Sequence, residues 1–205
     1  MTWDRVGASY DRVAGKYEAR FLHELQGKPR DRQLLEAFAA SVHDPVVEVG
    51  CGPGQIGDFV RRRGRSVVGI DVSPEMAKLA NGRLDGALAG DMRALPLATE
   101  GCGGVLAFYS LIHVRRSEVV AVLREFYRVL RAGGRVLFSA HEGEGEAELE
   151  ALLDEPVPMA VTFFALDELT AASRAAGLEV VLAERRAPYP SESDTVRLYI
   201  EAERP

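Results

Sequence analysis

The sequence predicts a single α/β domain built around a mostly parallel sheet. Strand-like and helical patterns alternate from residue 46 to the end of the chain, which is typical of such sheets. The apolar runs VVGI (67–70) and GVLAFY (104–109) are continuous rather than alternating, as buried parallel strands are. A turn with three glycines, at 50–54, separates the first strand from a helix. A length of 205 residues favours one domain over two.

Seven apolar runs are predicted as strands, and the third of them is short. Pro188 and Pro190 lie in the loop between the last two runs, which is short enough for a hairpin, so the final strand should enter the sheet antiparallel. The predicted strands are residues 45–49, 66–70, 87–89, 104–109, 135–140, 178–183 and 196–202.

Six helical segments are predicted from apolar residues at three- and four-residue spacing and from cap signals. Ser73 is expected as an N-cap, with Pro74 as the first helical residue. Gly133 and Gly134 are expected to end the fifth helix, and Gly177 the sixth. The predicted helices are residues 9–25, 31–42, 55–63, 74–84, 118–131 and 167–176.

Composition and charge exclude several classes of function. The chain has 25 basic and 31 acidic residues and a net charge of −6, the opposite sign from a general nucleic-acid binder. No apolar run approaches the ~18 residues of a membrane span. The first residues, MTWDRVGASYDR, carry early charge and no apolar core, so no secretory signal is expected. Two cysteines make no disulfide framework. We therefore expect a cytoplasmic protein with no nucleic-acid or membrane partner.

An acidic segment follows the fifth predicted strand. Residues 142–155 contain seven acidic side chains and no lysine or arginine. Such runs are usually solvated, so we expect an exposed helix or loop. The alternative is a flexible wall of a substrate pocket.

The glycine turn is the centre of the sequence. In Val46–Gly54 a buried strand runs into Gly50, Gly52 and Gly54, and a helix follows. Glycines permit a sharp turn and the close approach of a ligand, and the helix start suits an anionic group. A strand-to-helix turn with purely structural glycines would look similar, so the loop alone is a weak signal.

Two acidic residues follow the next two strands at regular spacing. Asp71 lies 21 residues past Gly50, at the end of the second strand, where a carboxylate can accept both ribose hydroxyls of a nucleoside. Asp91 lies 20 residues further on, where it could accept from an exocyclic amine of the base, with Met92 along the ring. The alternatives are two ordinary turn aspartates and a core methionine.

With these residues in place, the chain resembles the class I S-adenosylmethionine-dependent methyltransferases, and in particular the small-molecule branch of the ubiquinone/menaquinone C-methyltransferase type. A dinucleotide site fits less well, because an NAD fingerprint needs GxGxxG and Gly54 comes one position early. The matching stretches are YDRVAGKYEARF, VVEVGCGPG, VVGIDVSPEMAKLA, GDMRALPL, REFYRVLRAGGRVLF and FFALDELTAASRAAGLEVV.

The resemblance implies a fold, a cofactor and a reaction. The fold is one Rossmann-like domain whose seven-stranded mixed sheet has the order 3-2-1-4-5-7-6, the last strand antiparallel. Residues 1–44 form an N-terminal helical lid on a methyltransferase core, residues 45–205. The cofactor is S-adenosyl-L-methionine, which leaves as S-adenosyl-L-homocysteine after its methyl group passes to a small-molecule acceptor.

The resemblance also assigns the glycine turn to the methionine part of the cofactor. Gly50, Gly52 and Gly54 cradle it, near Glu48. Cys51, inside the same loop, is counted with these positions, and simple packing is the alternative.

The nucleoside is assigned to residues that follow the second and third strands. Asp71 is implied to hold the ribose, and Val72 and Met76 to pack on the adenine. Asp91 and Met92 are implied to recognise the edge of the base.

Four aromatic or hydroxyl side chains complete the implied cofactor site. Tyr109 and Ser110, at the tip of the fourth strand, face the sulfonium, and Tyr10 and Tyr17 match tyrosines of the lid helix. The alternative for Tyr10 and Tyr17 is a pair of half-buried aromatics in an amphipathic helix.

Catalysis needs a positioned nucleophile and, for a hydroxyl or protonated amine, a base. His113 and His141 follow the fourth and fifth strands, on the rim where open α/β sheets bind ligands, and with Tyr109 they are the catalytic candidates. The alternatives are a helix-cap or packing histidine at 113 and a surface-loop histidine at 141. The four histidines show no metal-ligand spacing, so no catalytic metal is expected.

The chemistry of the acceptor stays open. The Asn-Pro-Pro-Tyr and Asp-Pro-Pro-Tyr motifs of enzymes that methylate amines in nucleic acids do not occur after the fourth strand. The methylated atom could be oxygen, nitrogen or carbon, and the oligomeric state is undetermined. A nicotinamide-cofactor oxidoreductase and a non-catalytic S-adenosylmethionine-binding module are the alternative functions.

Overall fold

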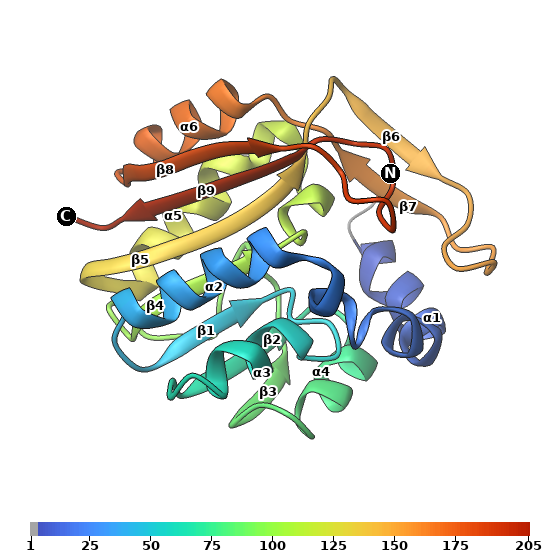
Figure 1. The fold of residues 1–205 in the computed structure, drawn as a ribbon, viewed down its shortest axis with the longest axis horizontal. Helices are drawn as coiled ribbons and strands as arrows, with labels where there is room; N and C mark the ends of the chain where they lie inside the picture. The colour runs from blue at the N-terminus through green and yellow to red at the C-terminus, as the bar shows by residue number, and fades with distance from the viewer. Residues whose placement is uncertain (1–3) are drawn as a thin grey trace.

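A seven-stranded mixed sheet organises the protein, whose computed structural model describes residues 4–205 (Figure 1). The strand order is β3-β2-β1-β4-β5-β9-β8, with β1 to β5 parallel and β9 antiparallel to both of its neighbours. The predicted order and the antiparallel last strand are confirmed. The strands are β1 (Val46–Val49), β2 (Val67–Asp71), β3 (Gly86–Ala89), β4 (Cys102–Phe108), β5 (Leu130–His141), β8 (Glu179–Arg186) and β9 (Arg197–Glu203).

Helices cover both faces of this sheet because side chains of successive strand residues point to opposite sides. In β5, Val136 and Phe138 pack in the core under the fifth and sixth helices, whereas Leu137 packs in the core under the second and third. The helices are α1 (Asp4–Phe21), α2 (Pro29–Ser41), α3 (Gln55–Arg61), α4 (Pro74–Ala80), α5 (Val119–Val129) and α6 (Leu166–Ala175), with the short turns η1 (Glu24–Gly27), η2 (Leu111–His113) and η3 (Arg116–Glu118).

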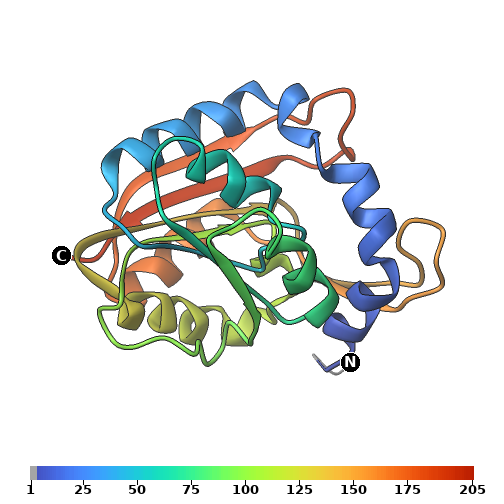
Figure 2. The ribbon, with the colours of Figure 1, turned by 90° about the horizontal axis from the view of Figure 1, so that it is seen from below.

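The two N-terminal helices play different parts. Helix α2 buries Leu34, Leu35 and Phe38 against the sheet and is part of the core. Helix α1 lies off the sheet faces, beside the orange hairpin of β6 (Glu146–Leu149) and β7 (Met159–Thr162) (Figure 2). Only α1 is therefore placed to cover a site at the carboxyl ends of the strands.

Two local expectations were wrong. Helix α5 ends at Val129, before the glycines expected to end it, because Leu130 already pairs with Cys102 in the sheet. The register then jumps to the pair Gly104–Arg135, and Gly133, at φ +72°, lies in the residues that bulge out between. The acidic segment was expected as a helix or loop, but residues 146–149 pair with β7 as a strand.

In the described part of the chain no helix is both long and apolar enough to cross a membrane.

Candidate functional site

The glycine turn needs its glycines for both conformation and space. Gly50, Gly52 and Gly54 have φ values of +70°, +51° and +85°, a region that other residues rarely adopt. A Cβ on Gly50 would lie 2.2 Å from the Cβ of Ser110, and one on Gly54 would lie 3.2 Å from Ala80 in α4. The turn is therefore packed tightly between Ser110, just after β4, and helix α4.

Asp71 joins the end of β2 to this turn. Its Oδ2 accepts from the backbone N–H of Gly52 at 2.8 Å, and its Oδ1 accepts from the N–H of Ser73, also at 2.8 Å. Burial raises the pKa of this carboxyl to about 6, against the opposing effect of the two N–H groups. Ser73 caps α4 as expected, because its side chain accepts from the N–H of Met76.

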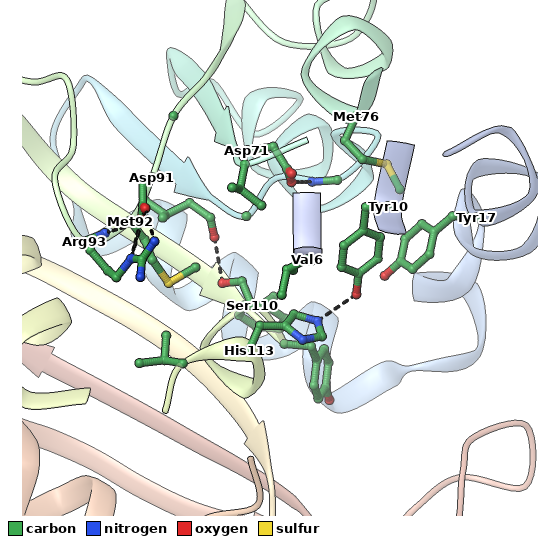
Figure 3. Close-up of a pocket in the computed structure, with 18 of the residues that line it drawn as sticks. Val6, Tyr10, Tyr17, Asp71, Met76, Asp91, Met92, Arg93, Ser110 and His113 are labelled. Atoms are coloured by element: carbon green, nitrogen blue, oxygen red, sulfur yellow. Dashed lines mark hydrogen bonds and ion pairs between the residues drawn. The ribbon is translucent and has the colours of Figure 1, made fainter. Parts of the chain in front are cut away.

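A cleft opens above the turn, at the carboxyl ends of β1, β2, β3 and β4. Its open space, with the mouth included, amounts to ≈ 800 Å³. It brings together twelve of the predicted site residues, several of which Figure 3 shows from α1 on one side and the strand ends on the other. These twelve are Tyr10, Tyr17, Gly50, Gly52, Asp71, Val72, Met76, Asp91, Met92, Tyr109, Ser110 and His113.

Three other predicted residues lie outside the cleft lining and support the turn. Glu48, 2% exposed, accepts from the N–H of Gly57 at 3.0 Å, and burial raises the pKa of its carboxyl well above the usual range. Cys51 is also buried, and burial raises the pKa of its thiol. Gly54 faces α4.

Asp91 meets a partner that the sequence analysis did not single out. Arg93 donates to both carboxylate oxygens of Asp91, at 2.6–3.0 Å. Partial burial acts to raise the pKa of Asp91, but the hydrogen bonds from Arg93 outweigh it and the pKa is lowered. Glu118 also lines the cleft, with its Oε1 4.0 Å from Arg93 Nη1. The two-residue spacing of Asp91 and Arg93 could have indicated their ion pair, whereas nothing in the sequence near Glu118 indicated its contact with Arg93.

His113 is held at both ring nitrogens. Its Nδ1 lies 2.7 Å from the carbonyl oxygen of Ala160 in β7, and its Nε2 lies 2.8 Å from the hydroxyl of Tyr10 in α1 (Figure 3). The ring is 6% exposed, and burial lowers its pKa to about 4, against the effect of the Ala160 carbonyl. His113 is therefore neutral near pH 7, and it joins α1 to the β6–β7 hairpin.

Tyr109 and His141 form a stacked pair in which only Tyr109 lines the cleft. Their ring centroids lie 5.3 Å apart, and Tyr109 has a φ of +53°. The Nδ1 of His141 lies 2.9 Å from Thr195 Oγ1. Burial, with the charge of Arg197, lowers the pKa of His141 to about 4. His141 thus supports Tyr109 and does not reach the cleft surface.

Three polar side chains behind Tyr109, those of Tyr199, Asp31 and Arg186, hold the position of its hydroxyl group. The Tyr109 hydroxyl lies 3.2 Å from that of Tyr199, which donates to Asp31 at 2.7 Å. Arg186 also donates to the Tyr199 hydroxyl, at 3.0 Å. Asp31 comes from α2 and Tyr199 from β9, so segments 168 residues apart set the position of one cleft side chain.

Asp11 is a further contributor that the sequence did not reveal. It lies on α1, and its Oδ1 accepts from the hydroxyl of Ser73 at 2.5 Å and from the N–H of Glu75 at 3.1 Å. These bonds tie α1 to the first turn of α4, next to Asp71. No local sequence pattern around Asp11 predicts these contacts, because its partners are more than 60 residues away.

Comparisons with known proteins agree with this arrangement. Residues 47–138 match the family model described as "Methyltransferase domain". A malonyl-[acyl-carrier protein] O-methyltransferase of Serratia marcescens is 33% identical over 136 residues, 65% of this chain and 51% of that protein. The chain spans about half the length of the curated relatives it matches first.

Solved structures share the fold over nearly the whole chain. An S-adenosylmethionine-dependent methyltransferase of Thermotoga maritima has a TM-score of 0.74 at 21% identity, covering 97% of this chain and 99% of that one. A structure described as a complex of the Haloferax volcanii Trm112 methyltransferase activator with a methyltransferase has a TM-score of 0.77 at 22% identity, covering 98% of this chain and 97% of that one.

Proposed function

Because the chain belongs to the class I S-adenosylmethionine-dependent methyltransferases, we propose that it transfers the methyl group of S-adenosyl-L-methionine to a small-molecule acceptor. The observation that carries the proposal is the contact between Asp71 and Gly52, which joins the proposed ribose-binding carboxylate to the glycine turn inside one cleft. S-adenosyl-L-homocysteine is then the second product.

The residues present fit this cofactor. Gly52 leaves open space toward the cleft, since a Cβ there would meet only Tyr17, at 3.8 Å. Among the described lining residues, Asp71, Asp91 and Glu118 are acidic and Arg93 is the one cationic side chain, a balance that suits a positively charged ligand. When bound, the cofactor supplies a methyl carbon already activated by a positive sulfur.

We assign binding roles by position in the cleft. Each carboxylate oxygen of Asp71 has accepted one N–H and keeps a lone pair for a ribose hydroxyl. Val72, Met76, Asp91 and Met92 also line the cleft and are proposed to hold the adenine. Glu48, Cys51 and Gly54 act through the turn, because they lie beneath it.

We place the acceptor beside His113, at the acceptor end of the cleft, where the Tyr10 hydroxyl lies 2.8 Å from Nε2. Tyr109 and Ser110 are proposed to face the sulfonium, and Tyr10 and Tyr17 to close over the cofactor. Tyr10 and Tyr17 lie edge to face, with ring centroids 5.7 Å apart, and give this end an aromatic wall that excludes water. His113 is the proposed base, and His141 positions Tyr109. Residues 1–44 are proposed as the lid segment, with α1 as its covering part.

Calorimetric titration tests this proposal. S-adenosylmethionine and S-adenosylhomocysteine should each bind with a stoichiometry of one, and NAD should bind more weakly. Preference for NAD would move the protein to the oxidoreductases. Incubation with methyl-labelled cofactor and a small-molecule extract then identifies the acceptor by its gain in mass. A protein that binds the cofactor and labels nothing would be a binding module.

A further inference from the structure

The hydrogen bonds of His113 decide which ring nitrogen can receive a proton. A carbonyl oxygen only accepts hydrogen bonds, so Nδ1, which faces the Ala160 carbonyl, carries the ring proton. Nε2 then holds a lone pair, and the Tyr10 hydroxyl donates to it. Both side chains line the cleft (Figure 3). The acceptor end therefore presents a proton-accepting nitrogen that a phenolic hydroxyl already occupies.

The charges around the cleft disfavour an anionic acceptor. Arg93 is the one cationic residue of the described lining, and it donates to both carboxylate oxygens of Asp91, with Glu118 4.0 Å from it. His113 is neutral and turns a lone pair inward. A carboxylate at this end would meet no uncommitted cation among the lining residues.

We propose that the acceptor is a neutral hydroxyl compound that replaces the Tyr10 hydroxyl on Nε2 of His113, and that carboxylates are rejected. This inference rests on the proposed methyltransferase function. The acceptor O–H donates to Nε2 while its oxygen attacks the methyl carbon. The carbon–sulfur bond breaks with its electron pair passing to sulfur, and the proton passes to Nε2 and then to solvent. One proton is released for each methyl ether formed.

A neutral hydroxyl acceptor differs from the malonyl group that the names of several relatives give as their substrate. The free carboxyl of a malonyl thioester is ionised at neutral pH and has no proton to donate. Its oxygens would face the lone pair of Nε2 and share the cleft with Asp71, Asp91 and Glu118. Leaving Nε2 and such a carboxylate unpaired should weaken transfer by roughly 10- to 100-fold.

Matched alcohols and acids test the inference directly. The full chain, with cofactor carrying a deuterated methyl group, is incubated with 4-ethylphenol against 4-ethylbenzoate, with 1-octanol against octanoate, and with the malonyl thioester of N-acetylcysteamine. Mass spectrometry should find label in at least one alcohol at a rate roughly 10- to 100-fold above its matched acid. Faster labelling of an acid or of the malonyl thioester overturns the inference, and so does labelling of neither alcohol.

Two further measurements separate this inference from the function on which it rests. Cofactor titration is made on the same sample: failure to bind S-adenosylmethionine removes both proposals, whereas binding with transfer to acids removes only the hydroxyl acceptor. Nitrogen-15 spectra of the S-adenosylhomocysteine-bound protein, assigned with His113→Gln, should show a proton on Nδ1 at pH 7. The Nε2 signal should shift with 4-ethylphenol and not with 4-ethylbenzoate. A proton on Nε2 would contradict the proposed acceptor class.

Discussion

Replacing Asp71 by alanine should damage both the glycine turn and cofactor binding. The carboxylate holds the N–H groups of Gly52 and Ser73 at 2.8 Å, and both would lose their partner, Ser73 in a buried place and Gly52 in a half-buried one. A hydrogen bond to a charged group contributes about 1.5–3 kcal/mol, and removing the buried charge offsets part of the two bonds, so we expect a loss of about 2–4 kcal/mol in unfolding free energy.

The same substitution removes the proposed partner of both ribose hydroxyls. A loss of about 2–3 kcal/mol in cofactor binding corresponds to a roughly 30- to 150-fold rise in Kd for S-adenosylhomocysteine. Urea unfolding measures the first effect, and calorimetry at a temperature where the variant is folded measures the second.

Asp91→Ala is the matched control for stability. Its carboxylate also accepts hydrogen bonds, from Arg93, but the side chains of Asp91 and Arg93 are 39% and 37% exposed, so its loss should cost at most about 1 kcal/mol in unfolding free energy. A folded Asp71→Ala variant with the wild-type Kd would refute the assignment of the ribose to Asp71. Equal losses of stability in the two variants would refute the argument from burial.

Three further outcomes follow from the site. Burial lowers the pKa of His113 in the folded protein to about 4 from an ordinary value of 6.5, so its contribution to stability is present above pH 6.5 and is lost as pH falls toward 4. In His113→Gln, a plot of unfolding free energy against pH should therefore be flatter between pH 4 and 6.5. An unchanged slope would assign the titration to another group. With an identified acceptor, His113→Ala should lower kcat by roughly 10²–10⁴ and leave the Kd of S-adenosylmethionine within a few-fold, whereas wild-type turnover would exclude His113 as the base. Gly50→Ala places a Cβ 2.2 Å from the Cβ of Ser110 and should lower the unfolding free energy, measured by heat or urea, by at least about 3 kcal/mol. Gly64→Ala, at φ +86° with nothing within 4 Å, should lower it only by the ~1–2 kcal/mol of backbone strain. Equal losses in the two variants would show that space at Gly50 is not limiting.

The strands and helices were predictable where the pattern is local. Continuous apolar runs marked buried strands, and Ser73 with Pro74 marked the start of α4, because caps and periodicity act over a few residues. The β6–β7 hairpin was missed, since its Glu146–Leu149 strand is largely exposed and carries neither an apolar run nor a turn signal. The end of α5 was misplaced because strand pairing of Leu130 overrides the glycine signal that follows it.

The glycine turn, the acidic residues at the ends of the parallel strands and the rim that carries Tyr109 and His113 could all be located from the residues alone. In an open parallel sheet the carboxyl ends of neighbouring strands meet at one edge, so strand ends in the sequence are neighbours in space. The contacts of each side chain became known only from the folded arrangement. Packing set His141 behind Tyr109 and occupied Nε2 of His113 with a hydroxyl 103 residues away. Such contacts depend on how α1 and the β6–β7 hairpin pack against the rest of the fold, and the spacing of residues along the chain does not predict that packing.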